Sequence, residues 1–312
     1  MRPRIAVVGS CNMDLVVSAH RMPRQGETVM GQHIRYVPGG KGANQAVGCA
    51  RLGADVSMIG AVGCDVFGQG IMHALRDEQI DLSGMLQVEA EPTGTATIIH
   101  ALQDNSIIVV PGANSCCSPE QVRSFRSRIE QANVLLVQLE VPLETVEAAI
   151  SIAHEKKIPT VLNPAPAATL PDTILQKVTI LTPNETEFEH LTGVSVEQAS
   201  DETLAGVIRE WELQYNHRIC LTRGKFGCTY RKENVLVHVP APHVEVVDTT
   251  GAGDAYNAAL AYAISLKWPI HRAVSFAVAA GSCSVTRFGA QKGMPNLAVA
   301  MEMNSSMNSH NV

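Results

Sequence analysis

The stretch from Asp248 to Ala259, DTTGAGDAYNAA, places an aspartate directly behind a Gly-Ala-Gly triplet. The small and apolar residues after Asp254 predict a helix, so this carboxylate lies in the first turn. The first N–H groups of a helix have no partner within it, and the helix dipole adds positive charge there, so such a start binds anions. One interpretation is an ordinary acidic helix start. The other is a site for a phosphoryl group, with Asp254 as a base beside it.

Asn12 and Asp14 follow the apolar run that ends at Gly9, in GSCNMDLVV. Ligands of α/β sheets bind beyond the carboxyl ends of the strands, where these side chains would lie. An amide and a carboxylate in this pattern can point the same way and hold neighbouring hydroxyl groups. Asn and Asp are also common in turns, so a plain turn fits the same residues.

Lys41 is surrounded by glycines in PGGKGANQAVGCARLG, at Gly39, Gly40 and Gly42. The segment is not a P-loop, because Lys41 is followed by glycine rather than Ser or Thr and the GxxxxGK spacing is absent. Glycines let the backbone approach a small ligand closely, and Lys41 and Asn44 would then donate hydrogen bonds to it. The alternative is a glycine-rich turn before a helix.

Polar residues also end three further apolar runs. Glu140 closes VLLVQLE, where a carboxylate is costly unless it is paired or exposed. Asn184 and Glu187 of TPNETE would share a helix face, and their oxygens suit Mg²⁺ that keeps several waters. An N-cap and capping box fit the same two residues. The turn Thr222–Gly227 offers backbone N–H groups to phosphates, or is a generic hairpin turn.

The elements that must position these residues follow a regular rhythm. Helical patterns, such as the one behind the N-cap Ser118, alternate with apolar runs at residues 4–10, 56–63, 134–140, 159–166, 178–185 and 218–224. Nearly continuous apolar runs predict parallel strands buried on both faces. The sequence therefore predicts an α/β fold with a doubly wound, mostly parallel central sheet flanked by helices.

Two segments break this rhythm, at residues 11–38 and about 93–110, because neither holds a helix long enough to cross over a sheet. They predict a small β-sheet that projects from the main one as a lid. Residues 1–300 are expected to form a single α/β domain that carries this lid. The polar, Met-rich tail 301–312 is expected to be disordered.

Composition excludes several classes of partner. The net charge of −6 and the aromatic content of 4% give no support for a nucleic-acid surface. No apolar run approaches the ~20 residues that span a bilayer, and the run near the start is too short for a signal peptide. The eight cysteines form no CxxC pair, which indicates reduced thiols and a cytoplasmic location.

The ordered motifs GSCNMDL, GGKGANQA, VQLEVPLE, NPAPA, TPNETE and DTTGAGD resemble the ribokinase family of sugar kinases, of phosphofructokinase-B type. The resemblance covers residues 5–295. It implies a ribokinase-like fold and an ATP-dependent kinase that converts D-ribose to D-ribose 5-phosphate. Asn12 and Asp14 favour a sugar with vicinal hydroxyls, because a deoxy sugar would leave one of them unpaired. A deoxyribokinase, another sugar or nucleoside kinase and a non-catalytic sugar-binding regulator are the alternatives.

The resemblance also implies roles for individual residues. Asp254 would be the base that deprotonates the sugar hydroxyl O5. The anion hole for the γ-phosphate would be formed by Gly251, Ala252 and Gly253. The sugar would be held by Asn12, Asp14, Gly40, Lys41, Asn44, Glu140 and Asp254. ATP would contact Asn184, Gly253, Val278 and the turn Thr222, Arg223, Gly224, Lys225, Phe226 and Gly227.

Metal ions and a second copy of the chain are implied as well. Mg²⁺ would sit near Asn184 and Glu187, through water. Activating K⁺ would be bound by Asp248, Thr250 and backbone carbonyls near Ser284, Arg287 and Gly289. Gly293 stands where ribokinases often carry Ser as a further cation ligand. The small sheet would be a lid that also joins two copies in a homodimer.

Overall fold

The structure, a computed structural model, describes residues 2–101, 104–233 and 235–309. Its main sheet has nine strands in the order β13-β12-β11-β10-β9-β8-β1-β4-β5. All neighbours from β11 to β5 run parallel, whereas β12 and β13 are antiparallel to their neighbours. The strands are β1 (Arg4–Val8), β4 (Asp55–Gly63), β5 (Asp81–Val88), β8 (Val134–Val137), β9 (Thr160–Leu162), β10 (Ile180–Leu181), β11 (Arg218–Thr222), β12 (Cys228–Lys232) and β13 (Val235–Val239).

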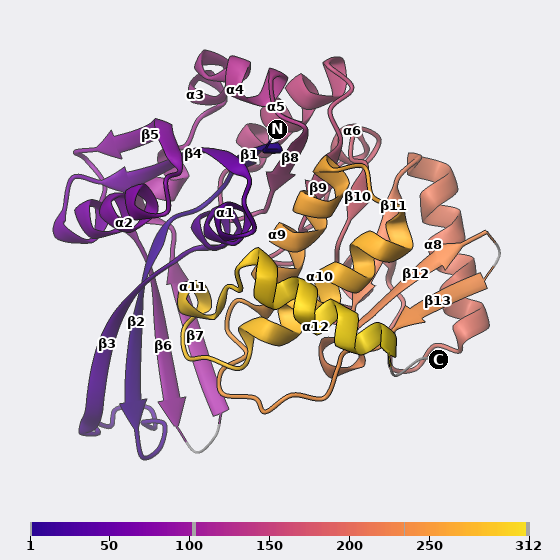
Figure 1. The fold of residues 1–312 in the computed structure, drawn as a ribbon. Coiled ribbons are helices and arrows are strands. Elements are labelled where there is room, and N and C mark those ends of the chain that lie inside the picture. The colour runs from indigo at the N-terminus through magenta and orange to yellow at the C-terminus, as the bar shows by residue number, and fades with distance from the viewer. Residues whose placement is uncertain (1, 102–103, 234, 310–312) are drawn as a thin grey trace.

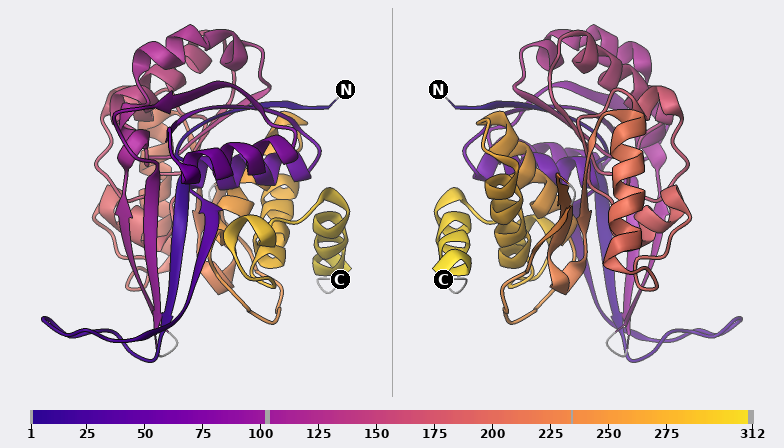
Figure 2. Two further views of the ribbon diagram at one scale, coloured as in Figure 1. Left: turned by 90° about the vertical axis from the view of Figure 1, so that its left-hand side faces the viewer. Right: turned by 90° about the vertical axis from the view of Figure 1, so that its right-hand side faces the viewer.

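Helices cover both faces of this sheet, as Figure 2 shows. In β1, Ile5 and Val7 pack into one core, and Ala6 and Val8 pack into the other. The first core lies under α1 (Lys41–Arg51), α2 (Val66–Asp77), α9 (Ala252–Ser265), α10 (Ile270–Ser284) and α12 (Leu297–Ser309). The second lies under α3 (Pro119–Ser124), α4 (Arg126–Glu130), α5 (Leu143–Glu155), α6 (Asp172–Leu175), α7 (Glu185–Thr192) and α8 (Asp201–Tyr215). The predicted doubly wound sheet is confirmed.

A second sheet projects from the body, as Figure 1 shows. Its strands β2 (Asn12–Ala19), β3 (Gly31–Gly39), β6 (Gly94–Ala101) and β7 (Asp104–Val110) follow the order β3-β2-β6-β7. The outer pairs are antiparallel, and the central pair β2 and β6 is parallel. The predicted small separate sheet is therefore confirmed, and we refer to it as the lid.

The structure corrects the expectation of a disordered tail. The chain is helical in α12 through Ser309, and residues 310–312 lie outside the described part. The helix is held because Ala300 is fully buried, and Leu297 and Met301 pack beside it against the core. Ser275 of α10 also donates a hydrogen bond to Asn304 Oδ1 over 2.8 Å. The polar composition of this segment therefore gave no sign of the few apolar residues that anchor the helix to the core.

Candidate active site

The order of the strands reverses beside β1. From β1 the chain continues to β4 and β5 on one side, and it later adds β8 to β11 on the other side. In open α/β sheets, ligands bind at such a switch point, outside the carboxyl ends of the strands. The segments that leave β1 and β8 there carry Ser10, Asn12 and Glu140. Ser10 Oγ donates to Glu140 Oε2 over 2.5 Å, so the two segments are joined at this edge.

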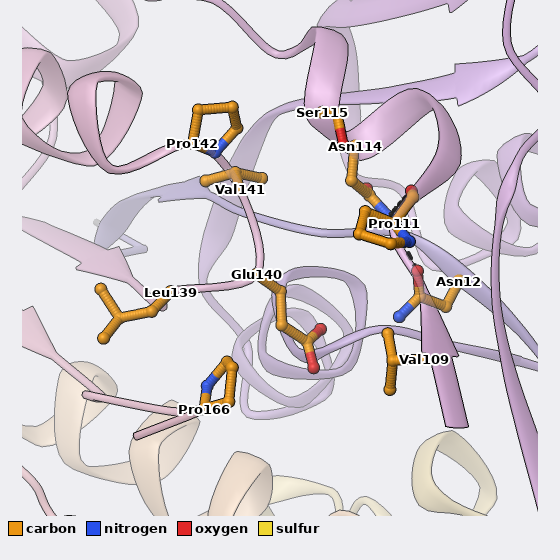
Figure 3. A pocket seen from close by; sticks show the side chains of 10 residues that line it. All are labelled: Asn12, Val109, Pro111, Asn114, Ser115, Leu139, Glu140, Val141, Pro142 and Pro166. Carbon is orange, nitrogen blue, oxygen red and sulfur yellow. Dashed lines mark hydrogen bonds between the residues drawn. The ribbon is translucent and has the colours of Figure 1, made fainter. Parts of the chain in front are cut away.

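A pocket of about 410 Å³ opens at this edge. Asn12 and Glu140 line it, together with Asn114 and the apolar side chains of Val109 and Leu139. Figure 3 shows the carboxylate of Glu140 and the amide of Asn12 pointing into it from opposite sides. The pocket thus combines apolar walls with polar groups that converge, as small-molecule sites do.

The start of α1 is pressed against the same edge. Gly40, its N-cap, has φ of 87°, and a Cβ there would lie 2.6 Å from the backbone nitrogen of Asn12. Glycine is needed at this position on both grounds. The close approach brings the Lys41 N–H to Glu140 Oε2 at 3.2 Å and leaves Asn44 in the first turn, buried. The glycines around Lys41 therefore place these residues at the sheet edge.

Asp254 lies in the first turn of α9 and is only 6% exposed. Its Oδ2 accepts a hydrogen bond from Asn44 Nδ2 at 2.9 Å, and its Oδ1 accepts one from Gln45 Nε2 at 3.0 Å. The two amides fix the orientation of the carboxylate. Asn44 was expected in the site, whereas Gln45 was missed because nothing in the sequence separates it from other buried helix residues.

A chain of buried amides continues behind Gln45. Gln138 Nε2 donates to Gln45 Oε1 over 2.6 Å, and Gln45 Nε2 also lies 3.2 Å from Asn163 Oδ1. Gln138 and Asn163 directly follow β8 and β9. The ends of these two strands therefore fix Gln45, which in turn fixes the carboxylate of Asp254. A buried network of this kind is rigid when its hydrogen bonds are made.

Hydrogen bonds also fix the peptide group of Gly253, directly before Asp254. Asn257 Nδ2 donates to the carbonyl of Gly253 at 2.9 Å, and its Oδ1 accepts from Thr182 Oγ1 at 2.6 Å. The Ala252 N–H is directed to the carbonyl of Thr249 at 3.2 Å. The N–H groups of Gly253 and Asp254 have no acceptor among the described residues. Of the predicted anion-hole residues, Gly253 therefore offers a free donor, and Asp254 adds a second one.

Gly251 makes this helix start possible. It is the N-cap of α9 with φ of 80°, and a Cβ there would lie 2.7 Å from the Cβ of Ala290. A side chain at this position would therefore be both strained and too close to its neighbour. The helix start owes its geometry to this glycine.

Acidic groups gather around one lysine. Asp14 is 7% exposed, and burial raises its pKa to about 7, helped by repulsion from Glu140 and Asp254. Burial alone would lower the pKa of Lys41, but attraction to Asp254 and Glu140 outweighs it, so this pKa is raised. The predicted sugar-binding residues thus form one charged cluster, with Lys41 as its cation.

The predicted nucleotide residues meet at the neighbouring strand ends. Asn184 forms a β-bridge with Thr222, which joins the start of α7 to the end of β11. The capping box is present: Glu187 N–H donates to Asn184 Oδ1 at 2.8 Å, and both Glu187 oxygens accept from Asn184 at 2.9 Å. Burial raises the pKa of Glu187, partly offset by the Asn184 backbone hydrogen bond and the attraction of Lys41.

The turn after β11 is exposed. Residues Gly224–Phe226 form a 3₁₀ turn, and Phe226 is 60% exposed with the cationic groups of Arg223 and Lys225 near its ring. Gly227 closes the turn with φ of 84°. Val278, by contrast, lies on the buried side of α10 and is only 4% exposed, so little of it is open to a nucleotide.

Two of the predicted cation ligands, Thr250 and Gly289, form hydrogen bonds with Asp248. Its Oδ1 accepts from the N–H of Thr250 at 2.9 Å, and its Oδ2 accepts from the N–H of Gly289 at 2.8 Å. The carbonyl oxygens of Ser284 and Arg287 receive no hydrogen bond from the described residues. The carbonyl of Gly289 already accepts the N–H of Gly293 at 2.9 Å. Carboxylate and open carbonyl oxygens are donors that a monovalent cation accepts, so the chemistry of Asp248, Ser284 and Arg287 fits K⁺.

Gly293 contributes no side-chain oxygen to this group. A Cβ there would lie 2.5 Å from the carbonyl oxygen of Ser284, so a serine would need the backbone to shift. Within the described residues, no group of three or more His, Cys, Asp or Glu side chains could hold a metal ion. A metal here would therefore depend on substrate oxygens, water or backbone carbonyls. No helix in the described part of the chain is long and apolar enough to cross a membrane.

Comparisons with known proteins identify the family of this chain. Residues 2–297 match the family described as pfkB family carbohydrate kinase. The ribokinase of Bacillus subtilis (strain 168) is 44% identical over 291 residues, which cover 93% of this chain and 96% of that protein. The deoxyribokinase of Salmonella typhi is 35% identical over 295 residues, or 94% and 96% of the two chains. The structure of Arabidopsis thaliana ribokinase complexed with ribose and ATP is 31% identical with a TM-score of 0.89, and the match covers 97% of this chain and 99% of that one.

The large, mostly parallel sheet with its separate small sheet is a ribokinase-like fold. Its polar residues meet at the sheet edge where open α/β sheets bind ligands. More particularly, the chain belongs to the pfkB family of carbohydrate kinases. The expectation drawn from the ordered motifs is confirmed at this level.

Proposed function

We propose that the protein transfers the γ-phosphoryl group of ATP to O5 of D-ribose and so forms D-ribose 5-phosphate. The observation that carries this proposal is the start of α9, where the buried Asp254 carboxylate stands beside free N–H groups of Gly253 and of its own backbone. Asp254 takes the proton of the sugar hydroxyl, and the N–H groups stabilise negative charge on the phosphoryl group.

The general base and the anion-hole N–H groups at this helix start contribute rate enhancements of different size. A positioned general base contributes about 10²–10⁴-fold to the rate. Each anion-hole donor contributes about 10²–10³-fold, by analogy with oxyanion holes. Asn44 and Gln45 hold the carboxylate in one orientation, so the base needs little reorganisation when the hydroxyl arrives.

The charged cluster at the sheet edge supports a polyhydroxylated substrate. Asp14 and Glu140 accept hydrogen bonds from hydroxyl groups, and Lys41 donates one. Asn44 Oδ1 is buried and has no hydrogen-bond partner among the described residues, so it can accept a further one. The Arabidopsis relative, whose structure was solved with ribose and ATP, supports the same choice of substrates.

MgATP is the expected phosphoryl donor. Both oxygens of Glu187 are already engaged by Asn184, so these residues meet Mg²⁺ through water molecules rather than directly. The phosphates are expected to lie between the turn Gly224–Phe226 and the helix start at Gly253. Closure of the lid excludes water, which otherwise competes with the sugar as acceptor.

We further infer that K⁺ binds at Asp248 and orders the loop that carries Gly251. The hydrogen bonds of Asp248 to Thr250 and Gly289 tie that loop to the segment before α11 (Ala290–Gly293), and bound K⁺ would neutralise the carboxylate. Replacing K⁺ by Na⁺ at equal ionic strength is expected to lower kcat in an ADP-release assay. Equal rates with both ions would refute this role.

We also infer that the lid joins two copies of the chain. Apolar side chains stand exposed on its strands, at Ile34, Tyr36, Ile107, Ile108 and Val110. Sedimentation equilibrium is expected to give twice the mass of one chain, and a monomer at micromolar concentration would contradict this. The cysteines of the described residues are free thiols, which supports a cytoplasmic location.

The substrate is tested by measuring ADP release with D-ribose, 2-deoxy-D-ribose, D-fructose and adenosine. The highest kcat/KM is expected with D-ribose. A higher value with 2-deoxy-D-ribose would assign the protein to the activity of its deoxyribokinase relative. Binding of D-ribose without any ADP release would leave only a sugar-binding role.

A further inference from the structure

Asn114 occupies the junction between the lid and the body. It lies in the 3₁₀ turn Gly112–Cys116 that follows β7, and it is 1% exposed. Its side-chain oxygen accepts the N–H of Cys11 at 2.8 Å, and its side-chain nitrogen donates to the carbonyl of Cys11 at 3.0 Å. Cys11 links β1 of the body to β2 of the lid. The Asn114 amide therefore pairs with Cys11 much as a neighbouring strand would.

This pairing decides which way the amide of Asn12 faces. Because the Asn114 oxygen meets the Cys11 N–H, its NH₂ group is the donor: one hydrogen serves the Cys11 carbonyl, and the other is directed to Asn12 Oδ1 at 2.8 Å, with the carbonyl of Pro111 at 3.0 Å beside it. A donor must meet an acceptor, so the Asn12 oxygen turns to Asn114 and its NH₂ group turns away. Figure 3 shows the Asn12 nitrogen on the side of Glu140, within the pocket.

Gly94 encloses the pair. It stands opposite Asn12 in the parallel pairing of β2 with β6. A Cβ at this position would lie 2.3 Å from Asn114 Nδ2 and 2.4 Å from Asn12 Oδ1. Only glycine leaves room for the two amides to meet here. Three segments of the chain thus converge to hold the Asn12 amide in one orientation.

We propose that Asn114 is a specificity-determining positioning residue, which keeps Asn12 as a hydrogen-bond donor toward the sugar; the inference rests on the proposed sugar-kinase function. Asp14 and Glu140 are carboxylates that accept hydrogen bonds. A sugar hydroxyl has one proton to give, so its oxygen needs a donor elsewhere. Asn12 supplies that donor, and a deoxy sugar would leave its NH₂ group unpaired in the site.

The substitution Asn114→Asp tests this role. It keeps the shape of the side chain and the acceptor for the Cys11 N–H, but it replaces the donor to Asn12 with a second acceptor. The Asn12 amide is then expected to turn over and present its oxygen to the sugar. We expect the KM for D-ribose to rise about tenfold or more, while the KM for ATP changes less than about twofold. The preference for D-ribose over 2-deoxy-D-ribose, as a ratio of kcat/KM, falls by a similar factor.

Gln121→Glu is the matched control. Gln121 is also an amide that bridges backbone groups, with hydrogen bonds of 2.8 Å to the carbonyls of Gly60 and Gly84, but it does not line the pocket. This variant is expected to keep the wild-type KM for D-ribose and the wild-type preference. Thermal unfolding of each variant establishes that it is folded. Asn114→Ala, which adds no charge, replaces Asn114→Asp if the latter does not fold.

A double-mutant cycle separates positioning from a general structural effect. If Asn114 acts through Asn12, then Asn114→Asp made in an Asn12→Ala background lowers the preference for D-ribose no further. Additive losses, an equal loss with both sugars, or a rise in the KM for ATP as large as that for D-ribose would overturn the proposal.

Failure of this inference is distinguishable from failure of the proposed function. The wild-type protein is assayed first, and another preferred sugar would replace D-ribose in the same experiments with its own deoxy analogue. If no sugar is phosphorylated, titration calorimetry with D-ribose takes the place of KM. An unchanged Kd in Asn114→Asp would then refute the role of Asn114, and a Kd about tenfold higher would support it.

Discussion

Asp14→Asn is predicted to stabilise the unliganded protein while it weakens sugar binding. Asp14 is buried among Glu140, Asp254 and Asp248, which together with burial raise its pKa from 3.8 to about 7. A carboxylate that is buried beside other acidic groups destabilises the folded state once it is ionised. Asparagine removes that charge but keeps the size of the side chain, and the sugar loses a charged acceptor.

The magnitude follows from the two pKa values. Because the folded state holds this proton more tightly than the unfolded state, the contribution of Asp14 to stability is fully present below about pH 4 and is lost as the pH rises to about 7. At about 1.4 kcal/mol for each pKa unit, the full difference is at most about 4 kcal/mol. Between pH 5 and pH 8, the advantage of the variant should grow by up to about 3 kcal/mol.

Urea unfolding of both proteins at pH 5 and pH 8, without sugar, measures this advantage. Asp81→Asn is a control of opposite sign, because hydrogen bonds from Ser83 and the charge of Arg128 outweigh burial and lower the pKa of Asp81. That control is expected to lose stability at pH 8. Lower stability of Asp14→Asn than of wild type at pH 8, or a difference in stability that does not change with pH, would show that ionised Asp14 does not destabilise the folded state.

Two further predictions concern the supports of Asp254. Gln45→Ala removes one of the two donors to the carboxylate and is expected to lower kcat about 10²-fold with little change in the KM for sugar; a rise in KM alone would contradict this. Gly251→Ala forces a side chain to φ of 80° and into contact with Ala290, and should lower both kcat and the free energy of unfolding, the latter by about 1–3 kcal/mol. Gly53→Ala, with φ of 95° and nothing within 4 Å, is the control that should keep the wild-type kcat.

The sequence predicted the strands whose apolar residues are continuous, because burial on both faces leaves that pattern. It did not predict β5, where buried and exposed residues are mixed along an edge strand. The edge strand β13 was missed for the same reason, and its neighbour β12 was missed because its residues Cys228–Lys232 are mostly polar. Elements at the margin of the sheet carry a weaker signal than those in its centre.

The site could be predicted as far as each residue stood in a local motif. Asn12, Lys41, Asn44 and Asp254 follow glycines or strand ends, and they meet at one edge of the sheet. Gln45, Gln138 and Asn114 could not be found in this way. Their role lies in hydrogen bonds to residues about 90 or more positions away, and a buried amide looks the same in the sequence whether it binds a catalytic carboxylate or a backbone carbonyl.

Asp254 is proposed to be the base for ATP-dependent phosphorylation of a sugar. Its most direct test is Asp254→Asn, measured by ADP release with D-ribose and by titration calorimetry with D-ribose alone. Asparagine cannot take a proton, and its single oxygen accepts from only one of Asn44 and Gln45, so ADP release should fall by about 10²–10⁴-fold while sugar binding survives. ADP release close to the wild-type rate would contradict the assignment of Asp254.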